Sequence, residues 1–277
     1  MDSSLSQNAL SRVLIVGSSS MIAQGVMSSA PEVSWRTASA RTPLTPADLE
    51  GIETVINFAL TQEYRVNEYD EANDIDLALA RAIADRPIRY ILLSSRKVYG
   101  LEGQFGVAEE GLIEPQGNYG INKYRTEGLL SEILGGRLTT LRVSNVLGDE
   151  RIPGRKSFMS MMLGGLVERD TITMDVHPSV RRDFISAPAC GKALLQVMAE
   201  PIPGIFNFGS GEPVAMGTIA EALMKGFGSG KIDVINDRVF DEFVLNVTKW
   251  NNRFGQIETA TELLEYCEGL GRKYARI

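Results

Sequence analysis

The stretch "VLIVGSSSMIAQGV", residues 13–26, joins a short apolar run to a series of small residues and then to a helical pattern. Residues 12–17 read as a buried strand, and Gly17, Ser20 and Ala23 follow at three-residue intervals where a helix should begin. A strand-to-helix turn presents free backbone N–H groups and the positive end of the helix dipole. The stretch therefore predicts a turn able to hold a pyrophosphate, although small residues here also suit plain packing of a helix on a strand.

The same alternation continues through the first half of the chain. Apolar runs predict strands, and longer amphipathic stretches predict helices. The expected strands are 12–17, 32–37, 53–60, 89–95 and 138–148, and the expected helices are 21–30, 67–86 and 122–134. Strand, helix and strand in repetition predict an α/β fold with a doubly wound parallel sheet. Ligands bind beyond the carboxyl ends of such strands, so the loops after Gly17, Ala59 and Ser95 should share one rim.

The pattern changes at about residue 149. "GDERIPGRKS", residues 148–157, is rich in glycine, proline and charge, and the segments after it alternate less regularly. We expect residues 1–148 to form a dinucleotide-binding domain that also receives part of 185–200. Residues 149–277 should form mainly a smaller, interleaved α/β lobe that binds the substrate.

Composition excludes several classes of protein. With 277 residues, 44% hydrophobic and 23% charged, and a net charge of -7, the chain is an ordinary globular protein without the basic surface that nucleic acid requires. Cys190 and Cys267 make no disulfide framework, and His177 is the only histidine, so no metal site is expected. The first residues lack a basic patch followed by an apolar core, and no apolar run reaches ~18 residues. These features predict a cytoplasmic protein that does not bind membranes.

The second expected strand bears on the choice of coenzyme. A site for NAD would offer Asp or Glu to the adenosine ribose, whereas this chain has "WRTASAR" at residues 35–41. Arg36 and Arg41 can pair with a 2′-phosphate, so NADP is favoured over NAD, although such arginines are also common on solvated surfaces. Asp48 is expected to contact the adenine. The turn should contribute Gly17, Ser19, Ser20, Met21 and Ile22 to the coenzyme site.

Two further segments carry groups suited to proton transfer. "LLSSRKVYG", residues 92–100, ends an expected strand with two serines, and "NYGINK", residues 118–123, places Tyr119 and Lys123 four residues apart. On a helix this spacing puts both side chains on one face, where the ammonium stabilises the phenolate. Ser95 can donate a hydrogen bond to the oxygen that is being converted. Any helix can carry such a pair, but its combination with the serine-ended strand is far more restrictive.

An ordered series of segments resembles one enzyme family over nearly the whole chain. The matching pieces are "GSSSMIA", "NFAL", Asn73, "SSRKVYG", "PQGNYGINK", "LRVSNVLG", "RRDFIS" and "FNFGSGEPV". Together they resemble the extended short-chain dehydrogenase/reductases, in the branch of the nucleotide-sugar epimerases and dehydratases. The resemblance implies a Rossmann fold, an NAD(P) coenzyme and a nucleotide-sugar substrate. Members of the family often dimerise through the helices that hold Asn73 and Tyr119, so a homodimer is expected.

The resemblance also implies roles for particular residues. Ser95, Tyr119 and Lys123 would be the catalytic trio, Lys123 would also hold the nicotinamide ribose, and Ala59 and Leu60 would line the coenzyme cleft. The residues expected at the substrate are Ser95, Arg96, Asn145, Arg182 and Arg238, with Arg155 and Lys156 as weaker candidates. Asn145 and the arginines at 182 and 238 would lie near the diphosphate. Each of these arginines could instead form a surface salt bridge.

Three reactions are compared on this scaffold. The 4,6-dehydratases that resemble this chain carry an Asp–Glu pair directly after the catalytic hydroxyl residue, and here those positions hold Arg96 and Lys97. Two cations cannot do that acid–base work, so dehydration is disfavoured. Epimerases and reductases both need only the trio. Because "WRTASAR" resembles the segment of GDP-fucose synthase-like reductases, reduction of a 4-keto sugar nucleotide is favoured over an NAD-dependent 4-epimerase. A catalytically silent NADP-binding regulator is a third hypothesis.

Overall fold

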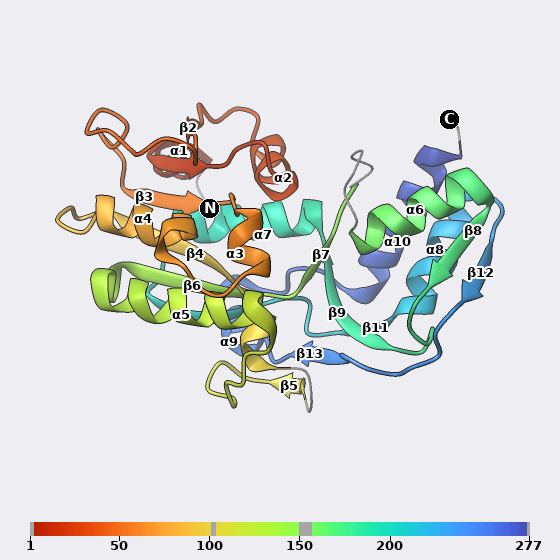
Figure 1. Cartoon of the computed structure of the whole chain (residues 1–277). Coiled ribbons are helices and arrows are strands. Elements are labelled where there is room, and N and C mark those ends of the chain that lie inside the picture. Colours follow the sequence, from red (N-terminus) through yellow and green to blue (C-terminus); the bar gives the residue numbers. More distant parts are fainter. Residues whose placement is uncertain (1–2, 101–103, 150–156, 276–277) are drawn as a thin grey trace.

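A computed structural model describes residues 3–100, 104–149 and 157–275, which form a large and a small lobe (Figure 1). The large lobe is built on a six-stranded parallel sheet in the order β10-β6-β4-β3-β1-β2. Its strands are β1 (Val13–Val16), β2 (Arg36–Ala38), β3 (Thr54–Asn57), β4 (Arg89–Ser95), β6 (Leu138–Val143) and β10 (Gly204–Phe208). The strand order reverses at β1, where a doubly wound sheet opens its ligand crevice. The sheet confirms the predicted α/β fold.

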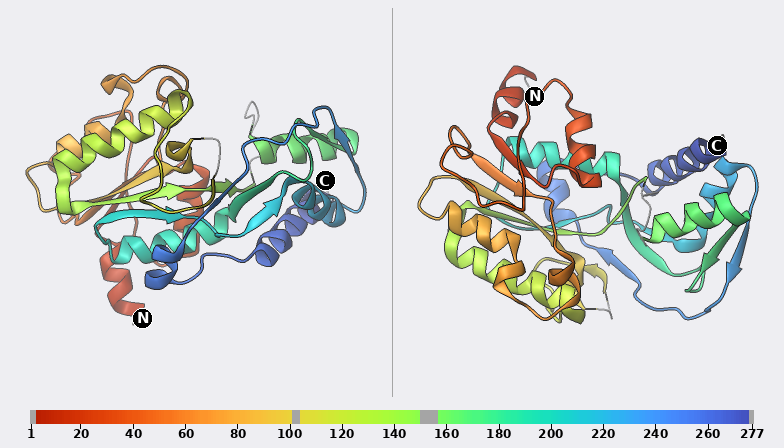
Figure 2. Two further views of the ribbon diagram at one scale, coloured as in Figure 1. Left: turned by 90° about the horizontal axis from the view of Figure 1, so that it is seen from below. Right: turned by 45° about the horizontal axis from the view of Figure 1, so that its top comes forward.

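Helices cover both faces of this sheet (Figure 2). One face carries α1 (Ser3–Leu10), α2 (Met21–Ser29), α7 (Ala187–Ala199) and α9 (Thr248–Phe254), and the other α3 (Gln62–Val66), α4 (Ile75–Ala82) and α5 (Gly117–Leu134). In β1, Val13 and Ile15 pack with α2 and α7, whereas Leu14 and Val16 pack with α4 and α5. A strand covered on both sides needs apolar residues throughout, which explains the continuous "VLIV" run.

The small lobe has its own core and its own sheet. This sheet runs β11-β9-β13-β5, with β7 paired to β9, and two further strands, β8 and β12, pair with each other. The strands are β5 (Gln104–Val107), β7 (Asn145–Leu147), β8 (Thr171–Met174), β9 (Arg181–Ser186), β11 (Pro213–Ala215), β12 (Lys231–Val234) and β13 (Phe243–Leu245). Three helices pack against these strands and enclose the core of the small lobe: α6 (Phe158–Arg169), α8 (Met216–Phe227) and α10 (Ala260–Tyr274).

The C-terminal half returns to the large lobe more than once. Besides α7, it supplies β10 at the edge of the central sheet and α9 on the same face of the sheet as α7. The Trp250 ring of α9 is fully buried and packs edge-on against Phe208 of β10, with ring centroids 4.8 Å apart. The lobes are therefore interleaved along the chain. None of the helices in the described part of the chain has the length and apolarity to cross a membrane.

Several predicted boundaries were wrong. The helix expected over 67–86 is the short 3-10 turn η1 (Glu71–Asn73) followed by α4, because Asp74 caps α4 by accepting the N–H of Leu77 at 3.0 Å. The segment 138–148 divides at Ser144: β6 ends at Val143 in the central sheet, whereas β7 begins at Asn145 and pairs with β9 of the small lobe.

Two other elements also differ from their predicted ranges. The expected strand 32–37 is reduced to β2, and α5 begins five residues before the predicted position 122.

A buried ion pair fixes α5 on the sheet. Arg142 of β6 donates from Nε and Nη2 to the two carboxylate oxygens of Glu127, at 3.2 and 2.8 Å, and Ser94 of β4 donates to the same carboxylate. Arg142 also donates to the hydroxyl of Tyr99 at 3.0 Å. All four side chains are buried. Because Glu127 lies on α5 and its partners lie on β4 and β6, the pair sets the height of this helix over the strand that ends in Ser95.

The Glu127→Gln variant should lose about 3–5 kcal/mol of unfolding free energy, because it leaves the buried Arg142 guanidinium without a counter-ion. Urea titration of both proteins measures the difference. Glu132→Gln, an exposed position on the same helix, is the matched control and should change stability by less than about 0.5 kcal/mol. Equal losses in the two variants would contradict the role given to the pair.

Candidate active site

A cleft of about 1400 Å³ opens between the lobes, beyond the carboxyl ends of β1, β3, β4 and β6. Most of the residues expected in the site line it. They are Gly17, Ser19, Ser20, Met21, Ile22, Arg41, Ala59, Leu60, Ser95, Arg96, Tyr119, Lys123, Asn145 and Arg182. Phe158 and Phe184 of the small lobe line the same space. Groups from eight separate segments of the chain are thus brought to one place.

Three of the expected residues lie away from the cleft lining. Arg36 is the first residue of β2, at the end opposite the rim, and its guanidinium donates to the carbonyl oxygens of Glu50 and Asp48 at 3.4 and 3.5 Å. The Asp48 carboxylate accepts the hydroxyl and N–H of Thr45, both at 2.7 Å, and these bonds lower its pKa. The strand was expected to end at residue 37, which would have placed Arg36 near the rim.

Arg238 is the third of these residues. It is exposed, donates to Asn236 at 3.2 Å and lies over the ring of Phe240. The weaker candidates Arg155 and Lys156 fall outside the described residues.

The turn after β1 has the geometry that a phosphate group requires. Gly17 has φ +76°, and a Cβ there would lie 2.7 Å from the backbone nitrogen of Ala59, so glycine is needed on both counts. Ser20 caps α2 by accepting the N–H of Ala23 at 3.1 Å. The residues from Ser18 to Ile22 line the cleft at the N-terminus of α2, where backbone N–H groups and the helix dipole favour an anion. These donors fit the pyrophosphate of a dinucleotide, with Ser20 in place of the usual second glycine.

Close packing brings the helix that carries Tyr119 against the turn that follows Ser95. Ser95 ends β4, and its hydroxyl accepts the N–H of Lys97 at 3.2 Å, which caps the turn η2 (Arg96–Tyr99). A Cβ on Gly120 would lie 2.6 Å from the carbonyl oxygen of Lys97, so α5 rests directly on this turn. Tyr119 and Lys123 lie one helical turn apart at that contact. No role was predicted for Gly120, although it follows Tyr119 directly in the motif "NYGINK".

Lys123 is buried and held by a carboxylate. Its Nζ lies 3.2 Å from Oδ2 of Asp76, whose Oδ1 accepts the amide of Asn57 at 3.0 Å and the hydroxyl of Tyr90 at 2.7 Å. Burial lowers the pKa of Lys123, but the negative charge of Asp76, with smaller contributions from Tyr64 and Tyr119, outweighs it and raises the pKa above its usual value. Lys123 is therefore a permanent cation beside Tyr119.

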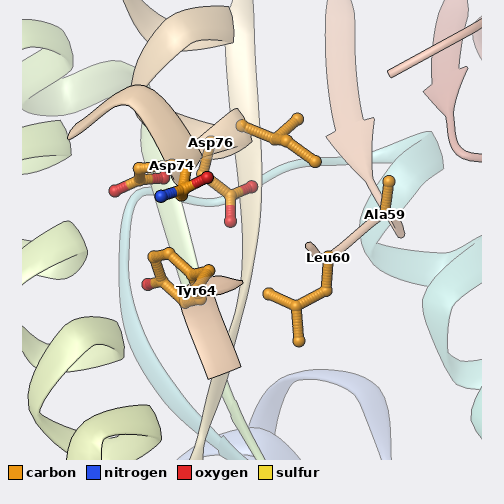
Figure 3. Close-up of a pocket in the computed structure, with 7 residues that line it drawn as sticks. Ala59, Leu60, Tyr64, Asp74 and Asp76 are labelled. Carbon is orange, nitrogen blue, oxygen red and sulfur yellow. The ribbon is translucent and has the colours of Figure 1, made fainter. Parts of the chain in front are cut away.

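A small hollow is lined in part by Asp76, the partner of Lys123 (Figure 3). Ala59 and Leu60 lie on one side of it, and Asp74, Asp76 and Tyr64 lie on the other. The hollow connects the rim after β3 with the carboxylate that holds Lys123. Sequence reasoning missed Asp76, which nothing in the local pattern distinguishes from a surface residue of a helix.

The comparison with known families agrees with this geometry. The model of the "NAD dependent epimerase/dehydratase family" matches residues 38–209. The chain belongs to this family. The segments that match include the rim after β3, the serine-ended strand and the Tyr119–Lys123 helix, as the sequence resemblance predicted.

A curated relative in this family is the ADP-L-glycero-D-manno-heptose-6-epimerase of Alkalilimnicola ehrlichii. It is 28% identical over 170 residues, which cover 57% of this chain and 53% of the relative. The chain thus matches about half the length of that epimerase.

Solved structures of family enzymes share the fold. TunA, described as an NAD-dependent NDP-hexosamine 5,6-dehydratase, has a TM-score of 0.80 at 16% identity over 96% of this chain and 97% of its own. MoeE5 in complex with UDP-glucuronic acid and NAD gives 0.76 at 18% identity, over 95% and 98%. RMD from Pseudomonas aeruginosa, complexed with NADPH, gives 0.74 at 19%, over 96% and 100%. At these identities the likeness establishes the fold alone.

A cluster of cations lines the cleft between η2 and the small lobe. Arg96 and Arg182 both contact Asp241, which precedes β13. Nη2 of Arg96 donates to Oδ2 at 2.6 Å, and Nη1 lies 2.6 Å from Oδ1 without hydrogen-bond geometry. Lys97 donates to Oδ2 at 3.1 Å, and Nε of Arg182 donates to the backbone carbonyl of Asp241 at 3.0 Å. Asp241 was not predicted, although it lies three residues after Arg238, because its contacts with Arg96 and Lys97 join segments far apart in the sequence.

The Gly120→Ala variant should lose about 1–3 kcal/mol of stability, because its methyl group would be forced against the Lys97 carbonyl. Gly128→Ala is the matched control on the same helix: its methyl group meets open space, and alanine should stabilise the helix by about 0.5–1 kcal/mol. Thermal unfolding of both variants measures the difference. If both alanines stabilised the protein, the close contact between α5 and the Ser95 turn would be refuted.

Proposed function

We propose that this protein is an NAD(P)-dependent enzyme that reduces a 4-keto nucleotide sugar. The observation that carries the proposal is the Lys123 ammonium, held by Asp76 beside Tyr119 in the cleft that Ser95 also lines. At the other end of the same cleft lies the phosphate-binding turn of Gly17 to Ile22. The small lobe, which contributes Arg182 to the lining, is proposed to bind the substrate.

The proposed roles follow from the chemistry of each side chain. When bound, the reduced nicotinamide supplies the hydride that adds to the carbonyl carbon. The Tyr119 phenol transfers its proton to the carbonyl oxygen, and Ser95 donates a hydrogen bond to the same oxygen. The fixed charge of Lys123 stabilises the phenolate that remains. An ammonium has three N–H donors, and only one is needed for Asp76, so the others can reach the ribose of the coenzyme.

The choice between reductase and epimerase rests on the coenzyme. Arg41 lines the cleft after β2 and is exposed, which suits a 2′-phosphate and supports NADP. An NAD-dependent epimerase is the second candidate, supported by the description of the family model and by the heptose epimerase relative. The catalytically silent regulator is the third. NAD released from the purified, denatured protein would favour the epimerase. A cytoplasmic location and a homodimer stay predictions from the sequence.

Tyr119→Phe is the first test of this proposal. The variant should lose about 10²–10⁴-fold in turnover while it still binds coenzyme, because only the transferred proton is removed. Turnover is followed as the nucleotide-sugar-dependent change in absorbance at about 340 nm, the band of reduced nicotinamide. Tyr124→Phe, on an exposed part of the same helix, should keep full activity. Equal activity in the two variants would refute the role of Tyr119, and an inert wild-type protein that binds NADP would support the regulator.

Arg41→Ala is the test of coenzyme choice. Loss of a charge-assisted bond to the 2′-phosphate should weaken NADPH binding by about 1.5–3 kcal/mol and leave NADH binding nearly unchanged. Arg36→Ala is the comparison, because its guanidinium is held by backbone carbonyls away from the cleft, and it should alter neither affinity. Fluorescence titration measures both dissociation constants. Equal effects of Arg41→Ala on NADH and NADPH would contradict the preference for NADP.

A further inference from the structure

The three cations around Asp241 are more than one carboxylate can neutralise. Arg96 is 3% exposed and the Asp241 side chain 9%, so the cluster is largely removed from water. Nε of Arg96 is buried without a hydrogen-bond partner in the part of the chain that the structure describes. A buried charge that lacks full compensation is costly, and an incoming anion would relieve that cost.

Other charged groups near the cluster do not remove the excess. Glu242 lies near Arg182, but its carboxylate contacts the guanidinium of Arg181 at 3.6 Å. Asp175 acts on Arg182 only through its charge. The pKa of Lys97 is lowered by burial and then by the like charge of Arg96, more than Asp241 raises it. The positive excess is therefore shared by Arg96, Lys97 and Arg182, of which Lys97 is the most exposed.

The position of this positive charge in the cleft indicates which part of a ligand it would contact. Arg96 and Lys97 directly follow Ser95 in the chain, and both line the cleft. The side chain of Lys97 is 34% exposed, so its ammonium can reach a bound molecule. The phosphate-binding turn of the coenzyme belongs to α2, a different element at the end of β1. An anion at Lys97 is thus close to the hydroxyl that is proposed to hold the reacting oxygen.

We propose that Lys97, supported by Arg96, binds a carboxylate on the sugar ring, so that the preferred substrates are nucleotide derivatives of uronic acids. This inference rests on the proposed function and specifies its substrate class. A carboxylate suits the site because it accepts a charge-assisted bond from the ammonium, while Arg96 stays bound to Asp241 over the ring of Phe243. A neutral hydroxymethyl group at the same place would leave the excess charge uncompensated.

The test compares pairs of ligands that differ only in this group. Isothermal titration measures the dissociation constants of UDP-glucose and UDP-glucuronic acid, of dTDP-glucose and dTDP-glucuronic acid, and of GDP-mannose and GDP-mannuronic acid. For the pair whose nucleotide is accepted, the acid should bind at least about tenfold more tightly. Lys97→Gln should abolish this preference, Lys97→Arg should restore most of it, and Lys231→Gln, exposed on β12, should leave it unchanged. Thermal unfolding verifies that each variant is folded.

The outcomes distinguish a failure of this inference from a failure of the proposed function on which it rests. Equal or tighter binding of the neutral sugar by the wild-type protein would overturn the carboxylate site and leave the proposed function standing. An equal loss for both members of a pair in Lys97→Gln would assign Lys97 to the shared diphosphate and would also overturn it. If no pair bound, the proposed nucleotide-sugar function itself would fail, and the inference would fail with it.

Discussion

The bond between the Glu127 carboxylate and the Arg142 guanidinium is the constraint on which the site depends. Ser94 joins the same carboxylate, so one buried group ties α5 to both β4 and β6. The residue after Ser94 ends β4 at the cleft, and the residue four positions before Glu127 is Lys123. A hydrogen-bonded pair enclosed by the core permits little sliding of the helix. The relative positions of hydroxyl, phenol and ammonium are therefore set by a buried ion pair whose own side chains, Glu127 and Arg142, do not line the cleft.

The two halves of the cleft treat charge differently. On the side proposed for the coenzyme, Lys123 pairs with Asp76 alone, and Asp76 also accepts hydrogen bonds from Asn57 and Tyr90. On the side proposed for the substrate, Asp241 faces three cations. The first arrangement keeps a cation in place, whereas the second attracts an anion. The same chemical groups thus suit the proposed catalytic position on one side and the proposed recognition surface on the other.

Local patterns predicted the parts of the fold that local forces determine. The buried strand at 89–95 was predicted to the residue, and Tyr119 and Lys123 share a helix as their spacing required. Partners separated by long stretches of chain could not be predicted: Asp76, Arg142 and Asp241 act through tertiary contacts that no periodicity encodes. The helix predicted at 67–86 was too long because its apolar pattern concealed the cap at Asp74. The strand predicted at 32–37 lies at 36–38, so Arg36, expected near the rim, begins the strand instead.

The interleaving of the lobes has a consequence for how the protein is made. β10 closes the edge of the central sheet and Trp250 of α9 packs on one face of it, yet β10 emerges from the ribosome after β9 of the small lobe and Trp250 emerges after β13. A nascent chain that stops before them exposes the flank of β6 and the apolar rings of the unfinished layer. The large lobe is therefore complete only after residue 254, when every element of the small lobe except α10 has already been made.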